Sequence, residues 1–218
     1  ADLDQDGQSE FVIVEPANAE ADGLLKVLDV QGQIVWTASL EGANPDIPAI
    51  GDVDGNGQLE VFAEAGSQVH AFTSDGTPLG SGWPVTVAAG DLAKVLADVN
   101  HDGRLELVTY SQDWVMANGL EVRELTVFDH AGAKIRQWQL PWCGFTNEVQ
   151  KIFPAVANLD EDENLEIVVV SGCNEIACYD LESDAPVWVS AAEGALLSSP
   201  VIGDLDGNGE LDIIVAAA

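Results

Sequence analysis

One acidic loop occurs five times along the chain, and its recurrence constrains the fold more than any other feature of the sequence. Every copy has Asp or Asn at its first, third and fifth positions and Asp or Glu at its ninth. The copies begin 50, 46, 60 and 46 residues apart, at Asp2, Asp52, Asp98, Asn158 and Asp204. Self-similarity at such a period predicts a repeat architecture built from similar units.

Short apolar segments flank the loops in a constant order and predict β-strands. A β-branched run follows every loop, and another apolar segment, such as Ile47–Ile50, precedes most loops. Two more strand-like segments with a turn between them follow each of the first four loops, for example Gln68–Thr73 and Thr77–Val87. Runs of this kind bounded by turn residues are typical of strands. No segment shows the period of an amphipathic helix, so the sequence predicts an all-β fold.

One unit therefore consists of a strand, the acidic loop, and three more strands joined by turns. Four antiparallel strands in each unit predict the blades of a β-propeller, with the loop between the first and second strands. A β-sandwich with aspartate-rich turns is the alternative, but it does not require the same loop in every unit. We expect a single repeat domain over residues 1–218, with units at approximately 1–41, 42–89, 90–143, 144–192 and 193–218, the first and last being partial.

The partial units predict a segment of a longer propeller. An open arc whose ends pair with neighbouring chains is the alternative, because bare sheet edges accept added strands.

The loop pattern predicts calcium binding, with up to five ions in the chain. Calcium takes about six to eight oxygen ligands, whereas magnesium requires a stricter octahedron and keeps more of its waters. Side chains at positions 1, 3, 5 and 9 and the carbonyl oxygen of position 7 converge if the backbone curls around one point, and a glycine at position 6 permits the turn. The predicted ligands are Asp2, Asp4, Asp6, Gln8, Glu10, Asp52, Asp54, Asn56, Gln58, Glu60, Asp98, Asn100, Asp102, Arg104, Glu106, Asn158, Asp160, Asp162, Asn164, Glu166, Asp204, Asp206, Asn208, Glu210 and Asp212.

The flanking sequence separates these loops from an EF-hand. An EF-hand needs a bidentate Glu at position 12 and a helix on either side, whereas position 12 of the first loop is Ile13, within a predicted strand. The fourth loop departs most from the pattern, because Asn158 replaces an acid and Glu163 replaces the turn glycine. We expect weaker binding or altered geometry there, and a structural role for the metal in the chain as a whole.

The charge balance excludes several partners. The chain has 38 acidic and 7 basic residues, a formal net charge of −31, which disfavours binding to nucleic acids and to anionic lipid surfaces. No apolar run reaches the roughly 18 residues of a membrane-spanning helix, and no signal peptide is recognisable. The histidines are scattered and no Cys-x-x-Cys pair occurs, so a zinc site is not expected.

The cysteine pattern leaves two interpretations of equal weight. Cys173 and Cys178 lie on either side of a predicted hairpin turn and form a disulfide in the first interpretation. In the second, all three cysteines, including Cys143, are free thiols.

The loop with its flanks resembles a known repeat family. Asp-x-Asp-x-(Asp/Asn)-Gly-x-x-(Asp/Glu), preceded by a segment such as Pro200–Asp204 and followed by an apolar strand, is similar to the FG-GAP/VCBS-type repeat. Segments around Trp36 and Trp83 also resemble outer-strand signatures of bacterial members. Such repeats build the propeller of integrin α subunits and of bacterial surface proteins. The resemblance implies a secreted or cell-surface protein that acts in structural assembly, adhesion or protein–protein interaction, with a protein or glycan partner or with self-assembly through its terminal strands.

Two other functions remain as alternatives. One is a polysaccharide-degrading propeller of the lyase type, although no Ser-His-Asp order, phosphate-binding glycine loop or His cluster is found, and we therefore expect no enzymatic activity and no catalytic residues. The other is carbohydrate binding by exposed aromatic side chains. Trp114 and Trp142, in the longer connections of the third unit, are the predicted partner site, whereas most other Trp residues are expected to pack between blades.

Overall fold

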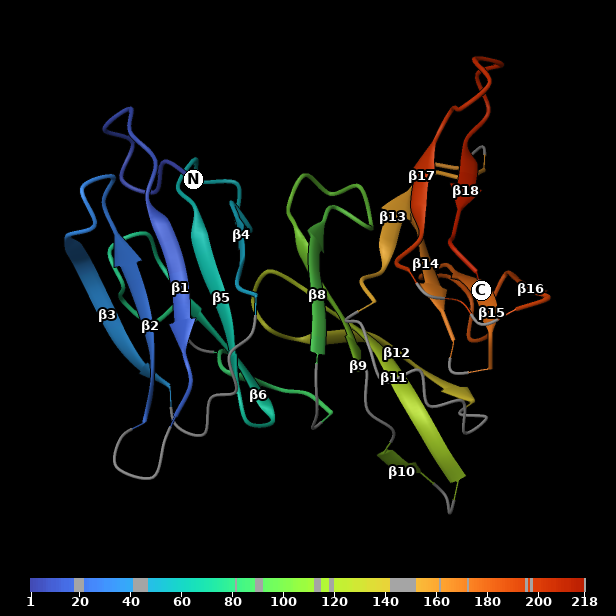
Figure 1. Cartoon of the computed structure of the whole chain (residues 1–218), viewed down its shortest axis with the longest axis horizontal. Helices are drawn as coiled ribbons and strands as arrows, with labels where there is room; N and C mark the ends of the chain where they lie inside the picture. Colours follow the sequence, from blue (N-terminus) through green and yellow to red (C-terminus); the bar gives the residue numbers. More distant parts are fainter. Residues whose placement is uncertain are drawn as a thin grey trace.

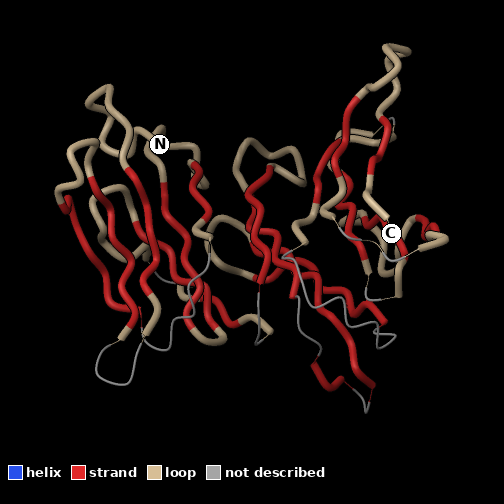
Figure 2. Tube along the Cα trace, in the orientation of Figure 1, coloured by secondary structure: helices blue, strands red, loops and turns tan. Residues whose placement is uncertain are grey.

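The chain forms an open arc of five antiparallel β-sheets (Figures 1 and 2). The computed structural model describes residues 1–17, 22–40, 47–80, 82–88, 92–111, 115–117, 120–141, 152–160, 162–171, 173–194, 196 and 198–217. Every regular element among these residues is a strand. We number the sheets as blades 1 to 5 in chain order. The predicted all-β, propeller-type architecture of antiparallel blades is confirmed.

In blades 1, 2, 4 and 5 the strands follow one another in space as they do in sequence, whereas in blade 3 β9 pairs with β11 rather than with β10. Blade 1 contains β1 (Phe11–Glu15), β2 (Gly23–Leu28) and β3 (Ile34–Leu40). Blade 2 contains β4 (Ala49–Gly51), β5 (Glu60–Ala65), β6 (Gln68–Phe72) and β7 (Val85–Thr86). Blade 3 contains β8 (Leu92–Ala97), β9 (Glu106–Ser111), β11 (Leu120–Phe128), β12 (Lys134–Pro141) and a short extra strand, β10 (Val115–Ala117), beside β11.

The last two blades complete the arc. Blade 4 contains β13 (Ala155–Ala157), β14 (Glu166–Val170), β15 (Glu175–Tyr179) and β16 (Trp188–Ala191), and blade 5 contains β17 (Val201–Gly203) and β18 (Asp212–Ile214). Neighbouring blades contact each other through their first strands, β4 with β8 and β13 with β17. No helix long and apolar enough to cross a membrane occurs in the described part of the chain.

The acidic loops join the first strand of a blade to the second, as predicted. The residue just before each loop pairs with the acid at its ninth position, as Gly51 pairs with Glu60 and Ala97 with Glu106. At the chain's start, the backbone N–H of Glu10 donates to the carbonyl of Ala1 in the same way, at 2.6 Å. The loops lie along one rim of the arc (Figure 1), where the Gln5 side chain of the first loop donates to the Gly57 carbonyl of the second.

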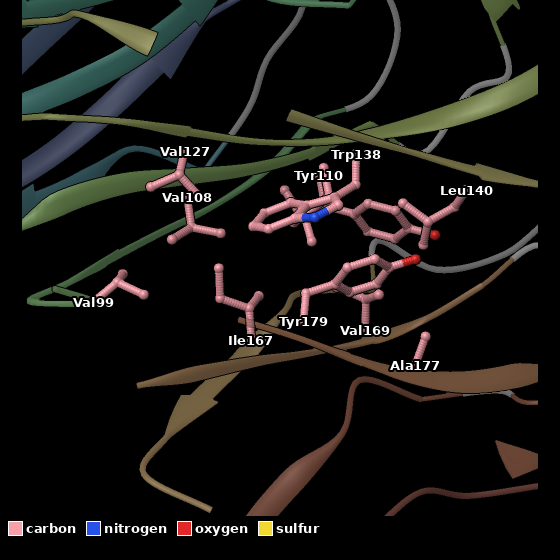
Figure 3. Close-up of a cluster of buried hydrophobic side chains, with 12 residues drawn as sticks. Val99, Val108, Tyr110, Val127, Trp138, Leu140, Ile167, Val169, Ala177 and Tyr179 are labelled. Carbon is pink, nitrogen blue, oxygen red and sulfur yellow. The ribbon is translucent and has the colours of Figure 1, made fainter. Parts of the chain in front are cut away.

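The hydrophobic core lies between successive blades, because a strand of a propeller exposes both of its faces to neighbouring sheets. One cluster joins blades 1 and 2, a second joins blades 2 and 3, and a third joins blades 3 and 4. In the cluster between blades 3 and 4, Trp138 and Tyr110 of blade 3 face Tyr179 and Ile167 of blade 4 (Figure 3). The central strands β5, β9 and β14 are buried on both faces for this reason, so buried residues do not alternate with exposed ones along them.

A tryptophan on the outer part of a blade also binds the turn of the next blade. The indole N–H of Trp36 donates to the Ser74 carbonyl at 2.8 Å, and that of Trp138 donates to the Ser183 carbonyl at 2.9 Å. Trp83 makes the same kind of bond to His130, at 3.3 Å. These three contacts confirm that tryptophans serve blade packing.

Two local predictions need correction. The strand predicted over Thr77–Val87 is reduced to the two residues of β7, because Pro78 and Pro84 lack the N–H that a ladder requires and Gly80 adopts a φ of 42°. Cys173 is disulfide-bonded whereas Cys178 is a free, buried thiol, so neither the Cys173–Cys178 bridge nor three free thiols is found.

Candidate metal centres

Each acidic loop is shaped by its own side chains accepting backbone N–H groups. The third-position oxygen accepts the N–H of the fifth residue, and the fifth-position oxygen accepts the N–H of the seventh, in all five loops. In the second loop, for example, Asp54 binds the N–H of Asn56 at 3.1 Å, and Asn56 binds that of Gln58 at 2.7 Å. These bonds curl the chain around one point, which is the arrangement that the sequence predicted for positions 1 to 7.

The carboxylate at the ninth position closes the loop. One of its oxygens accepts the N–H of the second residue in every copy, as Glu60 does from Val53 at 3.0 Å and Asp212 does from Leu205 at 3.0 Å. This bond commits one oxygen of each ninth-position acid to the protein backbone. The second oxygen is therefore the one that is available to a cation.

In the described residues, four loops bring three carboxylates together. One oxygen from each of the three lies within 4.8 Å of the others in the groups Asp2, Asp4, Asp6; Asp52, Asp54, Glu60; Asp160, Asp162, Glu166; and Asp204, Asp206, Asp212. The acidic loops that follow β4, β13 and β17, together with the first loop of the chain, thus assemble candidate metal centres from side chains only a few residues apart.

Three of these carboxylate oxygens are buried without a hydrogen-bond partner. They are Asp2 Oδ1, Glu60 Oε1 and Glu166 Oε1, and the two glutamates are 0% and 2% exposed. A buried carboxylate oxygen with no donor is costly for the fold, because it has lost its water and gained nothing in exchange. A bound cation removes this cost, so the residues present fit a metal ion.

Three buried carboxyl groups at the ninth position have raised pKa values. Burial raises the pKa of Glu60, Glu106 and Glu166, although a backbone N–H donated to each carboxylate opposes the shift. The carboxylates at loop positions 1, 3 and 5 add repulsion, and the pKa of Glu106 reaches about 7. Such grouping of acids around a buried carboxyl is unfavourable without a counter-charge.

The third loop does not bring three carboxylates within the same distance in the described structure. Asn100 stands at its third position, and its amide nitrogen contacts Asp102 at 3.3 Å and Glu106 Oε1 at 3.5 Å. The amide group therefore supplies a donor to Glu106 Oε1, whose counterparts in Glu60 and Glu166 have no hydrogen-bond partner. Asp98 still accepts the N–H of Gly103 at 2.9 Å, as the first residue of a regular loop does.

The fourth loop differs at the two positions where its sequence departs from the pattern. Its first residue, Asn158, donates its side-chain amide to the Asp162 carbonyl, whereas the first residues of the other loops accept the N–H of the sixth. Glu163 does not adopt the positive φ of 87° to 92° that glycine has at the sixth position elsewhere. The predicted altered geometry is found at this end of the loop, while Asp160, Asp162 and Glu166 still converge.

The sequence-based reasoning missed the importance of the fourth position. This residue also has a left-handed backbone, with a φ of 62° at Gln5, 73° at Gly55, 56° at His101 and 76° at Gly207. Glycine at this position in the second and fifth loops was the available signal. The other prediction about binding residues, a partner site at Trp114 and Trp142, falls outside the described residues.

Comparison with known proteins supports the fold but assigns the chain to no family. No protein-family model matches the chain, and no curated protein does. Similar solved structures include rhamnogalacturonan lyase PL11 of Bacillus licheniformis (TM-score 0.54, 19% identity, 89% of this chain and 48% of that chain) and BamB from Moraxella catarrhalis (0.50, 13%, 88% and 53%). A europium-containing methanol dehydrogenase has a TM-score of 0.56 and 8% identity over 95% of this chain and 45% of that chain. At these identities the similarity shows a propeller-type fold alone, and this chain spans about half the length of each.

Proposed function

We propose that the chain is a calcium-binding, extracellular repeat module whose metal ions hold its blades in shape for structural assembly, adhesion or protein–protein interaction. The observation that carries the proposal is the buried second oxygen of Glu60 and Glu166, which has no hydrogen-bond donor and belongs in each case to a group of three converging carboxylates. A cation satisfies the oxygen and offsets the repulsion within the group at the same time.

The ligand set favours calcium over other metals. All side-chain ligands are carboxylate or amide oxygens, which hard cations prefer, and no His or Cys belongs to the groups. Residues at positions 1, 3, 5 and 9, with the carbonyl oxygen of position 7, would hold the ion. The number of protein oxygens supports calcium rather than magnesium, which keeps several of its waters.

The position of the loops supports a structural role. The second to fifth loops each join the first two strands of a blade, and the first strands form the contacts between blades 2 and 3 and between blades 4 and 5. An ion that fixes the loop therefore also fixes the strand pair beside it. Binding to the folded loop alone stabilises the fold by mass action, since the unfolded chain offers no preformed site. The resemblance to FG-GAP/VCBS-type repeats supports the extracellular assignment.

Calorimetric titration of the chelator-treated protein with Ca²⁺ and with Mg²⁺ tests the proposal. We expect Ca²⁺ to bind several sites with Kd values of about 10⁻⁴–10⁻³ M, the range of extracellular modules, and to raise the melting temperature. Mg²⁺ is expected to bind more weakly. The variant Asp54→Asn, combined with Glu60→Gln, is expected to lose one site. Titrations without Ca²⁺ binding, or a melting temperature that excess chelator leaves unchanged, would refute the proposal.

A further inference from the structure

We propose that the calcium sites of neighbouring acidic loops are coupled, so that an ion in the fourth loop strengthens the binding of an ion in the third loop, and the reverse. The inference rests on the calcium binding proposed above and adds how one site regulates the next. The coupling is carried by contacts between loops of consecutive blades, which lie along the same rim of the arc (Figure 1).

The second residue of one loop and the eighth residue of the next loop belong to the same hydrophobic cluster. This holds at three successive interfaces, for the pairs Leu3 and Leu59, Val53 and Leu105, and Val99 and Leu165. The contact is close, because a Cβ at Gly51, the residue just before the second loop, would lie 2.9 Å from Cδ1 of Leu105. Each cluster therefore includes the base of two consecutive loops.

Both of these positions adjoin a predicted calcium ligand. The N–H of the second residue donates to the ninth-position acid of its own loop, as Val99 does to Glu106 Oε2 at 2.9 Å. The eighth residue directly precedes the ninth-position acid of the next loop, as Leu165 precedes Glu166. An ion that fixes Glu106 therefore also fixes the residue against which Leu165 packs.

A backbone hydrogen bond joins the third and fourth loops directly. The N–H of Leu165 donates to the carbonyl of Val99 at 2.9 Å. Val99 is thus bound on both sides, through its N–H to Glu106 and through its carbonyl to the residue before Glu166. Two hydrogen bonds and one covalent link connect the ninth-position ligands of these two loops.

A second contact joins neighbouring loops on their exposed side. The side-chain amide of Gln5, at the fourth position of the first loop, donates to the carbonyl of Gly57, at the sixth position of the second. The same two positions meet between the second and third loops, where a Cβ at Gly55 would lie 3.6 Å from the Gly103 carbonyl oxygen. The N–H of Gly57 donates to the first-position ligand Asp52 at 2.8 Å, so this contact also adjoins a ligand.

Two effects of opposite sign decide the direction of the coupling. An ion that orders one loop lowers the conformational entropy that the next loop must lose on binding, which favours the second ion. The third and fourth loops each have three acids at liganding positions, so a bound Ca²⁺ reduces the charge of either loop and weakens its attraction for an ion next to it. Salt screens this second effect between exposed loops, with a Debye length of about 8 Å at physiological ionic strength, but it does not break the contacts. We therefore expect positive coupling.

Hydrogen exchange measured by mass spectrometry over a series of free Ca²⁺ concentrations, at physiological ionic strength, tests the proposal. Peptides that cover residues 2–10, 98–106 and 158–166 report on the first, third and fourth loops separately. Backbone N–H groups bound to the loop carboxylates exchange more slowly once an ion fixes those carboxylates. The Ca²⁺ concentration that gives half of the protection is the midpoint for each loop.

The double variant Asp160→Asn, Asp162→Asn removes two ligands of the fourth loop. Asn is compatible with both positions, because Asn100 at the third position of another loop accepts the N–H of Asp102, and Asn56 at the fifth position accepts that of Gln58. We expect the fourth loop to lose its protection by Ca²⁺ and the midpoint of the third loop to rise by about fivefold, at the lower end of the range for coupled sites. The first loop, which is not a neighbour of the fourth, is expected to keep its midpoint.

A charge-matched control separates contact from electrostatics. The double variant Glu163→Gln, Glu182→Gln removes the same two charges from the fourth loop and its blade without removing a predicted ligand, and it is expected to leave the third-loop midpoint unchanged. The reciprocal double variant, Asp98→Asn with Asp102→Asn, is expected to raise the fourth-loop midpoint by a similar factor, because coupling between two binding sites is mutual.

The results distinguish a failure of the coupling from a failure of calcium binding. A third-loop midpoint that loss of the fourth-loop ligands leaves unchanged or lowers would overturn the coupling while the calcium sites stand. An equal rise in the charge-matched control would overturn it too, since electrostatics alone would then explain the shift. If Ca²⁺ protects none of the loops in the wild-type chain, the proposed function itself is wrong and the coupling falls with it.

Discussion

Replacing Glu106 with Gln is expected to stabilise the cation-free protein above pH 7 and to weaken the stabilisation that calcium provides. Glu106 is 0% exposed, and its burial, together with the carboxylates of Asp102 and Asp98, raises its pKa to about 7 against hydrogen bonds from Val99 and Asn100. The folded state holds the carboxyl proton of Glu106 more tightly than the unfolded state does. The protonated Glu106 side chain therefore contributes fully to stability below pH 4.5, and this contribution is lost as the pH rises to about 7.

The magnitude follows from the displacement of the pKa of Glu106, from 4.5 to about 7. At about 1.4 kcal/mol per pKa unit, ionised Glu106 costs the folded state about 3 kcal/mol above pH 7. Gln cannot ionise and avoids this cost, but its amide nitrogen replaces the oxygen that Asn100 contacts at 3.5 Å. The loss of that contact costs about 1 kcal/mol. The net gain in the free energy of unfolding is therefore about 2 kcal/mol above pH 7, and at pH 4 the variant is slightly less stable than the wild type.

Urea denaturation followed by tryptophan fluorescence, in excess chelator at pH 4 and pH 8, measures this difference. Glu182→Gln, at an exposed acid outside the loops, is the control and is expected to change stability little at either pH. With saturating calcium the order at pH 8 is expected to reverse, because the wild type gains more from the ion. Equal destabilisation by Glu106→Gln at both pH values would show that burial and repulsion do not govern this site.

Three further changes test the packing and the fourth loop. Lys94→Met removes one member of the buried ion pair in which Lys94 Nζ lies 3.6 Å from Glu64 Oε2, and it is expected to lower the free energy of unfolding by about 3–5 kcal/mol. Changing both residues to apolar ones is expected to restore most of this loss, and a loss below about 1 kcal/mol in the single variant would contradict the reasoning. Gly76→Ala is expected to lower the melting temperature of the protein more than the control Gly66→Ala does, because Gly66 has a similar left-handed φ but no ring near it. Equal decreases in melting temperature would refute the packing argument. Asn158→Asp is expected to strengthen calcium binding at the fourth loop by about tenfold in calorimetric titration, and an unchanged Kd would mean that the first position does not limit that site.

The local features of this protein were predictable because they depend on residues close together in the chain. Positions 1, 3, 5 and 9 of the acidic loop converge through hydrogen bonds that span at most seven residues, such as that from Val53 to Glu60. The strands on either side of each loop pair through the same short connection, so loop and strand order could both be read from the spacing. The predicted strand over Thr77–Val87 was wrong, because its apolar residues serve packing while Pro78 and Pro84 interrupt the ladder.

The loop positions, the order of the strands and the propeller-type architecture were thus determined by the sequence itself, since periodicity and turn chemistry act locally. Only the tertiary structure decided which oxygens are buried without a donor, how far the pKa of Glu106 rises, and which turn receives each indole ring. These properties depend on blades brought together from distant parts of the chain, such as Trp36 and Ser74. Burial and cross-blade contact are set by that assembly, and no pattern within one repeat contains them.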